Sequence, residues 1–243
     1  MRKPGADLLR GMLARNHELA QRTRGAEFPL IQFETLQSWQ LDRLTTTFSD
    51  LYEEEGYRHA VEFFVSDLYG GMDFRERDQE MGRVMPIMIR FLPDKALVAL
   101  AEAFELQAIS LEYDFRMADY MAQQGLHQLD MAAYCSVYLA CSDRHGRERQ
   151  IQLFPKIGRD LNKLVRKSIV NYLLRMLRGP AHAAGFGLLQ EFLESGLDSF
   201  RALKDPDYFV DTIYQREWDS MQRLFAGDPD PFRFQGRYSR NVP

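Results

Sequence analysis

Three carboxylates on one long predicted helix are among the residues of this sequence most able to do chemistry. Glu102, Glu105 and Glu112 lie in a segment whose apolar residues form two stripes on nearly opposite sides of a helix. A helix that is apolar on two sides is expected in the middle of a bundle, so we expect partial burial of these carboxylates. A buried carboxyl group with a raised pKa is a recognised mark of a functional site. The structural alternative is ion pairing with the preceding arginines, namely Arg75, Arg77, Arg83 and Arg90.

A second candidate is a polar strip in the stretch EGYRHAVE. Glu55, His59 and Glu62 share one face of the helix predicted there. A glutamate and a histidine one turn apart can reach the same metal ion, and helical bundles use such pairs. The chain lacks the Glu-x-x-His motif of the di-iron bundles. Because charged residues usually cover an outward helix face, the strip is also typical of a solvated surface.

The third candidate is His182, in the stretch RGPAHAAGFGLL. The small residues around it would let a neighbouring helix or a flat cofactor come close. A lone imidazole on an apolar face could ligate haem iron, although the chain has no Cys-x-x-Cys-His for covalent attachment. The alternative is a core or capping histidine with a single hydrogen-bond partner.

Basic residues are concentrated in one part of the chain. Residues 144–178 contain ten lysines and arginines against two acids, while the whole chain has a net charge of −4. On a helix predicted over 159–178, the outward cations are Arg159, Lys163, Arg166 and Lys167. Such a strip could meet an acidic protein, a second copy of the chain, an anionic lipid surface or nucleic-acid phosphates. No helix-turn-helix or zinc-finger signature favours nucleic acid.

The elements that position these residues are all predicted to be helices. Apolar residues recur at three and four positions, and no sustained period-two run rich in Val, Ile and Thr is present. The fold class is therefore all-α, with about eight or nine helices in one compact bundle. The predicted helices cover residues 6–23, 34–55, 57–69, 93–123, 130–141, 159–178, 181–203 and 208–225, with short pieces between 73 and 91.

Composition limits the class of protein. The chain has 243 residues, of which 45% are hydrophobic and 27% charged, as in ordinary soluble globular proteins. No apolar run approaches the roughly 18 residues of a membrane span, and the amino terminus lacks the apolar centre of a signal peptide. We therefore expect a cytoplasmic protein with a helical domain over 1–226 and a loose tail over 227–243. Cys135 and Cys141 are expected to remain free thiols.

One region resembles a known group of sequences. The run FFVSDLYGGMDFRERD, followed by RVMPIMIRFLP and LAEAFELQAISLEYD, is similar to uncharacterised bacterial proteins that share an FFLEE motif. At 63–67 the two aromatic residues and one acid match the motif, whereas the leucine and the first glutamate do not. The resemblance implies an all-helical fold, and it assigns no activity and no catalytic residue.

Two classes of function fit these observations. The first is a non-enzymatic interaction or regulatory module that uses its basic helix, together with Trp39 or Trp218, to engage an acidic partner or a second copy. The second is a helical bundle that holds a ligand, a haem or a metal, and that could be an enzyme. The absence of a recognisable catalytic constellation favours the first class. The cofactor, if there is one, is not indicated by any motif.

Overall fold

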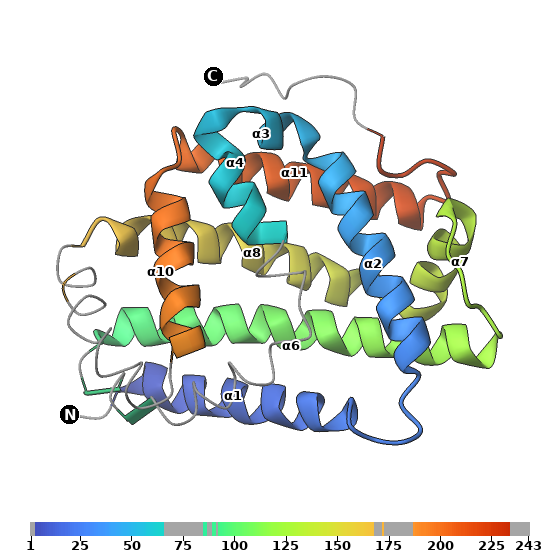
Figure 1. The fold of residues 1–243 in the computed structure, drawn as a ribbon, viewed down its shortest axis with the longest axis horizontal. Helices are drawn as coiled ribbons and strands as arrows, with labels where there is room; N and C mark the ends of the chain where they lie inside the picture. Colours follow the sequence, from blue (N-terminus) through green and yellow to red (C-terminus); the bar gives the residue numbers. More distant parts are fainter. Residues whose placement is uncertain are drawn as a thin grey trace.

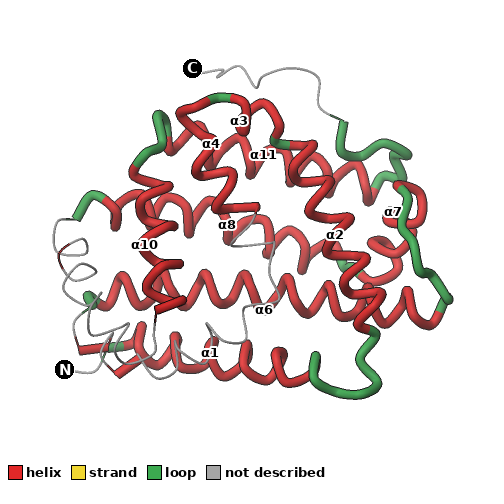
Figure 2. The backbone as a smooth tube through the Cα atoms, in the orientation of Figure 1, coloured by secondary structure: helices red, strands yellow, loops and turns green. Residues whose placement is uncertain are grey.

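The protein was analysed as a computed structural model, which describes residues 3–65, 85–86, 89–90, 92–167, 172 and 187–233. The described part is built from helices alone and contains no strand (Figures 1 and 2). The helices are α1 (Pro4–Arg22), α2 (Leu30–Thr47), α3 (Ser49–Glu53), α4 (Glu55–Glu62), α6 (Asp94–Gln123), α7 (Met131–Cys141), α8 (Arg144–Val165), α10 (Gly187–Arg201) and α11 (Pro206–Phe225). The predicted fold class is therefore confirmed.

The long helix α6 runs through the middle of the molecule. It contacts α1 on one side and α2, α7 and α8 on others, as Figure 1 shows. Both predicted apolar stripes are used: Phe104 and Ala108 are buried from one stripe, and Tyr113 is buried from the other. Since a helix enclosed by neighbours needs apolar residues around most of its circumference, the two-sided pattern has a direct structural cause.

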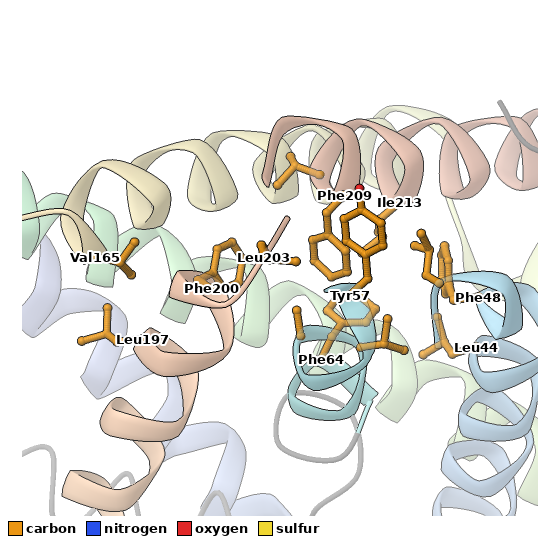
Figure 3. Packing of buried hydrophobic residues seen from close by; sticks show 14 residues of the cluster. Leu44, Phe48, Tyr57, Phe64, Val165, Leu197, Phe200, Leu203, Phe209 and Ile213 are labelled. Atoms are coloured by element: carbon orange, nitrogen blue, oxygen red, sulfur yellow. The ribbon is translucent and has the colours of Figure 1, made fainter. Parts of the chain in front are cut away.

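The largest apolar cluster joins α4, α10 and α11. The stripe predicted on the first of these helices is buried, with Tyr57, Ala60, Val61 and Phe64 each at most 6% exposed (Figure 3). Phe209 stacks parallel to Tyr57 with ring centroids 6.3 Å apart. Aromatic burial of this extent supplies much of the hydrophobic stabilisation of a small core.

Helix α8 differs most from its prediction. The sequence predicted a helix over 159–178, but α8 begins at Arg144, contains Pro155 in its interior and ends at Val165, and residues 168–178 except Tyr172 lie outside the described residues. Asp143 caps the first turn, because its Oδ1 accepts a hydrogen bond from the Gly146 amide at 2.6 Å. An interior proline costs a backbone hydrogen bond. Packing against α6, α10 and α11 offsets that cost. These contacts are between distant segments, so the local sequence pattern does not predict them.

The segment predicted as one helix over 34–55 is divided. Helix α2 ends at Thr47 and α3 covers Ser49–Glu53, and Phe48 lies at the junction with a φ of −112°. Its side chain is 1% exposed and packs edge-on against Phe64, with ring centroids 6.3 Å apart. Burial of this ring in the core thus accompanies a local departure from helix geometry.

After α11 the chain folds back on the bundle. Gly227 has a φ of +76°, and the next amide, that of Asp228, donates to the carbonyl of Arg223 at 3.0 Å, as in a Schellman cap. Residues 228–233 then return along α2 and α7, with Phe232 packed near Trp39. The division into a domain over 1–226 and a tail over 227–243 stays a prediction, and residues 234–243 lie outside the described residues.

Among the described residues, no helix combines the length and the apolar composition that crossing a membrane requires.

Candidate functional site

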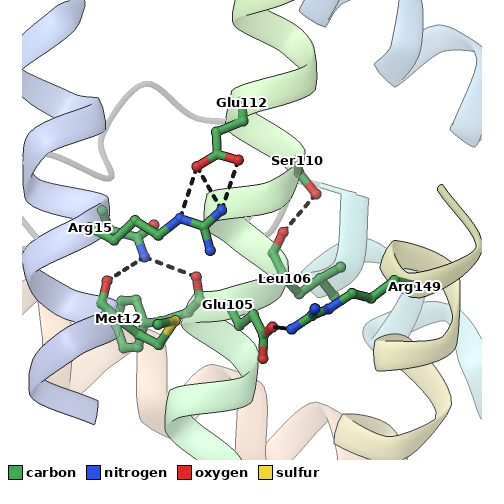
Figure 4. Close-up of polar contacts among 9 residues, drawn as sticks. Met12, Arg15, Glu105, Leu106, Ser110, Glu112 and Arg149 are labelled. Carbon is green, nitrogen blue, oxygen red and sulfur yellow. Dashed lines mark hydrogen bonds and ion pairs between the residues drawn. The ribbon is translucent and has the colours of Figure 1, made fainter. Parts of the chain in front are cut away.

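The three predicted carboxylates of α6 are all ion-paired. Glu112 lies against Arg15 of α1, whose Nε and Nη2 each donate to a carboxylate oxygen at 2.8 Å (Figure 4). Glu105 pairs with Arg149 of α8 (Figure 4). Glu102 accepts a hydrogen bond from the Nζ of Lys156, which also lies on α8. The described partner of Glu102 is thus Lys156, and the predicted pairing with Arg75, Arg77 or Arg83 is not tested because these arginines lie outside the described residues.

These pairs explain the heptad spacing of acids along α6. Asp119, seven residues after Glu112, pairs with Arg22, seven residues after Arg15. Two parallel helices repeat the same contact after two turns, so the acids and arginines hold α1 against α6 in one register. This role is structural, and ligand binding by Glu102, Glu105 or Glu112 stays a prediction.

The polar strip of α4 faces solvent. The side chain of His59 is 72% exposed, and its Nδ1 lies 3.3 Å from an oxygen of Glu62. Glu55 is exposed at the start of the helix. Within the described ranges, no three histidine, cysteine or acidic side chains lie close enough together to hold a metal ion. His182 lies outside the described residues, so its surroundings do not enter the site.

The predicted basic strip is largely matched by acids of the same chain. Arg159 pairs with Asp211 of α11 at 3.2 Å, and Lys163 pairs with Asp160 at 2.9 Å. Arg166 donates to the side chain of Asn162, and Lys167 follows the end of the helix. Trp39 and Trp218 are both only partly exposed, and Trp39 stacks on Tyr134 with centroids 3.8 Å apart.

A cavity of about 190 Å³ lies at the centre of the bundle. Its walls come from α2, α6, α7, α8 and α11, with side chains of Phe63 and Phe64 after α4 and of Phe200 on α10. The lining is polar at the end formed by α2 and α7 and apolar at the end formed by α4 and α10. The cavity therefore has two chemically different ends along the axis of α6.

Asp114 is the acidic group of the polar end. The Nε2 of Gln40 donates to its Oδ1 at 3.1 Å, and the side chain of Gln37 also hydrogen-bonds to it. Burial raises the pKa of Asp114 to about 6, although both glutamines and the charge of Arg147 oppose the rise. No described lysine or arginine is in ion-pair contact with this carboxyl group. Asp114 is thus poised to hold or release a proton near neutral pH.

Arg147 is the basic group of the same end and is 6% exposed. Its guanidinium carbon lies 3.8 Å from the ring centroid of Tyr113 and 4.4 Å from that of Tyr138. Its hydrogen bonds reach only neutral groups, Ser142 and Gln150, each at 2.9 Å, and the sulfur of Met117 at 3.5 Å. Among the described residues it has no carboxylate partner, so a cation is buried with its charge uncompensated by contact.

A hydrogen-bond chain fixes this arginine in place. Gln150 accepts from Arg147 and donates through Nε2 to Ser110 at 2.8 Å, and Ser110 donates to the carbonyl of Leu106 at 2.9 Å. The ring of Tyr113 is held by a hydrogen bond from its hydroxyl to Asp143 at 2.9 Å. Burial and this bond raise the pKa of Tyr113 to about 12, so it stays a neutral donor.

The middle of the cavity contains an unsatisfied donor. Gln107 lines the wall, and its buried Nε2 has no hydrogen-bond partner among the described residues. A buried donor without a partner costs free energy, and a ligand acceptor would recover it.

The segment after α11 covers the polar end. Phe232 lines the cavity, and its ring centroid lies 4.8 Å from the guanidinium carbon of Arg43 and 5.8 Å from the ring centroid of Tyr134. Arg43 is paired with Glu217 of α11. The carbonyl of Arg233 accepts from Arg223 at 2.6 Å, which ties the segment to the helix before it.

Sequence reasoning missed Asp114 and Arg147, the two charged groups of the cavity that have no ion-pair partner among the described residues. Asp114 was not singled out, and Arg147 was counted only as part of the basic segment. A signal was present for the first: Gln107, Ser110 and Asp114 recur at three and four positions on a helix expected to be buried on two sides. Arg147 and Gln150 have the same spacing. No helix was predicted over residues 142–158, however, so the spacing of Arg147 and Gln150 could not be assigned to a helix face.

The arrangement is suited to holding a small polar molecule. One ion pair, Arg43 with Glu217, lines the polar end together with the guanidinium of Arg147, the carboxyl group of Asp114 and several amide side chains, and the space is apolar beyond them. The described lining includes neither histidine nor cysteine, so the polar groups that it offers to a ligand are mainly side-chain oxygens and amides.

Comparison of the chain with curated proteins and with solved structures gave no match. The FFLEE resemblance is not tested by these comparisons and stays a prediction. One family, described as Domain of unknown function (DUF8198), matches residues 20–231 and so includes every helix that lines the cavity. The chain belongs to this family, DUF8198.

Proposed function

We propose that this protein binds a small organic molecule in its central cavity. The observation that carries the proposal is the presence of Asp114 and Arg147 in the lining of one cavity, where Arg147 is buried, Asp114 is partly buried, and neither is in ion-pair contact with a described side chain. Burying either group costs free energy. Groups of this kind, converging on an internal space, are characteristic of binding sites.

The size of the cavity limits the ligand. A cavity of roughly 150 Å³ holds a benzene molecule, and this one has about 190 Å³. A small aromatic or short aliphatic compound fits that volume. Haem, which is several times larger than benzene, does not fit it, and the described lining offers no histidine for the iron. Haem binding therefore remains a prediction tied to His182 rather than to this cavity, and metal binding remains one tied to Glu55, His59 and Glu62.

Interaction with an acidic partner or a second copy of the chain is a separate prediction. We place it after ligand binding because Arg159 and Lys163 are matched by Asp211 and Asp160 within the chain. Exposed pairs of this kind leave a weaker field for an outside partner. Nucleic acid is placed lower still, since no recognition motif accompanies the cations.

Neutral probes test the proposal most directly. Benzene and 1-hexanol would be added to the full chain, and the thermal midpoint of unfolding and the heat of binding would be measured. A compound that binds the folded state alone raises the midpoint with concentration. We expect the thermal midpoint to rise with probe concentration and the titration to show a heat of binding.

Two matched variants locate that binding. Ala103→Met places a flexible side chain into the cavity from α6, whereas Ala140→Met adds the same side chain on the exposed face of α7. Ala103→Met should abolish the binding of both probes, and Ala140→Met should leave it unchanged. If both variants bound the probes as the unmodified chain does, or if no probe bound the unmodified chain, ligand binding in this cavity would be rejected.

A further inference from the structure

We infer that the ligand is an amphipathic carboxylate, with its carboxylate against Arg147 and its apolar part among the aromatic side chains at the other end of the cavity. This inference rests on the proposed function and names the chemical class of ligand for the same site.

The charges at the polar end favour an anion. Arg43 and Glu217 neutralise each other as a pair, which leaves Arg147 and Asp114 as the charged groups that no contact compensates. When Asp114 is protonated, this end carries one positive charge. A ligand carboxylate removes that charge, whereas an amine doubles it or competes with Arg147 for Asp114.

The guanidinium of Arg147 is already oriented for such a ligand. Each of its terminal nitrogens makes one described hydrogen bond, to Gln150 and to Met117. Every terminal guanidinium nitrogen carries a second N–H, so one N–H on each is left to donate. Two such donors in one plane match the two oxygens of a carboxylate. The rings of Tyr113 and Tyr138 hold that plane in place.

The opposite end supplies an apolar surface. Phe64 and Phe154 meet edge-on there with ring centroids 5.3 Å apart, and Phe209 closes the wall from α11. From Asp114 to Ala103 the distance along α6 is about 16 Å at the usual rise per residue. A short amphipathic compound whose head group is held at the polar end therefore directs its hydrocarbon part toward the apolar end. Scaled from benzene, the volume admits about eight non-hydrogen atoms, which is the size of hexanoate.

Asp114 makes the binding depend on pH. The groups around it are Gln37, Gln40 and Arg43 on α2, Arg147 on α8, Tyr134 and Tyr138 on α7, and Glu217 on α11. A ligand carboxylate beside Asp114 favours its protonated form, which can donate a hydrogen bond to the ligand. Binding is then coupled to proton uptake. The affinity for a carboxylate falls as the pH rises above the pKa of Asp114, by up to about tenfold for each pH unit.

The test compares three probes that differ only in the head group: hexanoate, 1-hexanol and hexylamine. Their dissociation constants for the full chain would be measured by titration calorimetry between about pH 5 and pH 8. We expect hexanoate to bind at least about tenfold more tightly than either of the others at the lower pH, because a hydrogen bond to a charged group is the strongest contact offered. We also expect hexanoate alone to weaken steadily as the pH rises.

Two variants assign the head-group contacts. Arg147→Met should weaken hexanoate by about tenfold or more while leaving 1-hexanol within about twofold. Asp114→Asn keeps the shape of the carboxyl group but cannot titrate, so hexanoate affinity should become independent of pH. The second variant keeps the inference testable if the first does not fold.

The outcomes separate the inference from the proposed function. If 1-hexanol or hexylamine bound as tightly as hexanoate, and Ala103→Met abolished that binding, the cavity would be a ligand site but not a carboxylate site. Hexanoate binding that survived Arg147→Met unchanged would also overturn the inference. If hexanoate bound but Ala103→Met had no effect on it, the proposed function would fail as well, since the binding would lie elsewhere.

Discussion

Two buried arginines in this bundle have opposite surroundings. Arg216 of α11 donates to both oxygens of Asp50, at 2.7 and 2.6 Å, and to the carbonyl of Thr47 at 2.6 Å. Arg147 of α8 is equally enclosed but donates only to neutral groups, while Asp114 lines the same cavity without touching it. The first pair is complete within the chain. The second leaves a cation and a carboxyl group available to something else.

The two carboxyl groups show the same contrast in their pKa values. The hydrogen bond from Arg216 lowers the pKa of Asp50 below its ordinary value of 3.8. Burial without a contacting cation raises the pKa of Asp114 to about 6. A carboxyl group that is stabilised as an anion is part of the framework, whereas one that the fold destabilises as an anion is the better candidate for function.

Among the variants that test this comparison, Arg216→Met is expected to have the largest effect on stability. It leaves Asp50 without its partner, so the free energy of unfolding should fall by about 3 kcal/mol. Arg147→Met strands no contacting carboxylate and should cost only about 1 kcal/mol. Urea unfolding of both variants checks the difference, with Arg159→Met of the exposed pair as a control near zero. Equal losses for the two buried arginines would break the comparison.

Asp114→Asn should act in the opposite direction. In the unmodified chain the folded state holds its proton up to about pH 6, so stability is full below about pH 4 and is lost as the pH rises through 6. The variant has no such loss and should be more stable at pH 7 by up to about 3 kcal/mol. Unfolding measured from about pH 4 to pH 8 should show the two curves separating. Asp211→Asn, at an exposed position, serves as the control.

Asp50→Asn should alter the pH dependence of stability in the acidic range, whereas Asp114→Asn alters it near neutral pH. The pKa of Asp50 is lowered in the folded state. Its carboxylate therefore stabilises the fold fully above its ordinary pKa of 3.8, and this stabilisation is lost as the pH falls through the lower folded pKa. The unmodified chain should therefore lose more stability than the variant as the pH falls from above 3.8 to the lower folded pKa. Acid unfolding followed by circular dichroism measures this slope. A steeper slope for the variant would contradict the described pairing with Arg216.

The smallest effect is expected from Glu102→Gln. Glu102 is buried, but its partner Lys156 is 58% exposed, and a pair with one partner in solvent is expected to contribute only about 1 kcal/mol. Glu102 does not line the cavity, so the affinity for hexanoate should not change. Urea unfolding and the same calorimetric titration check both expectations. A loss of hexanoate binding in this variant would return Glu102 to the candidate site.

The sequence by itself determined the helical class and most helix positions. Apolar residues at three and four positions are a local property of the chain, and the burial of Tyr57, Phe64 and Phe104 follows directly from them. The heptad of acids on α6 was equally visible, although its partners Arg15 and Arg22 were not. Helix α8 was placed poorly because Pro155 opposes a helix locally, and only contacts with other helices outweigh it.

Only the tertiary structure decided which polar groups share a cavity. Asp114 and Arg147 are 33 positions apart in the chain, and Gln40 is 74 positions from Asp114. Residues so distant meet only when α2, α6 and α8 pack in one register. Helical periodicity indicates which face of a helix is buried, but it does not indicate what lies opposite that face. The charge of Arg147, which no described side chain pairs, is therefore a property of how the helices pack and not of any one segment.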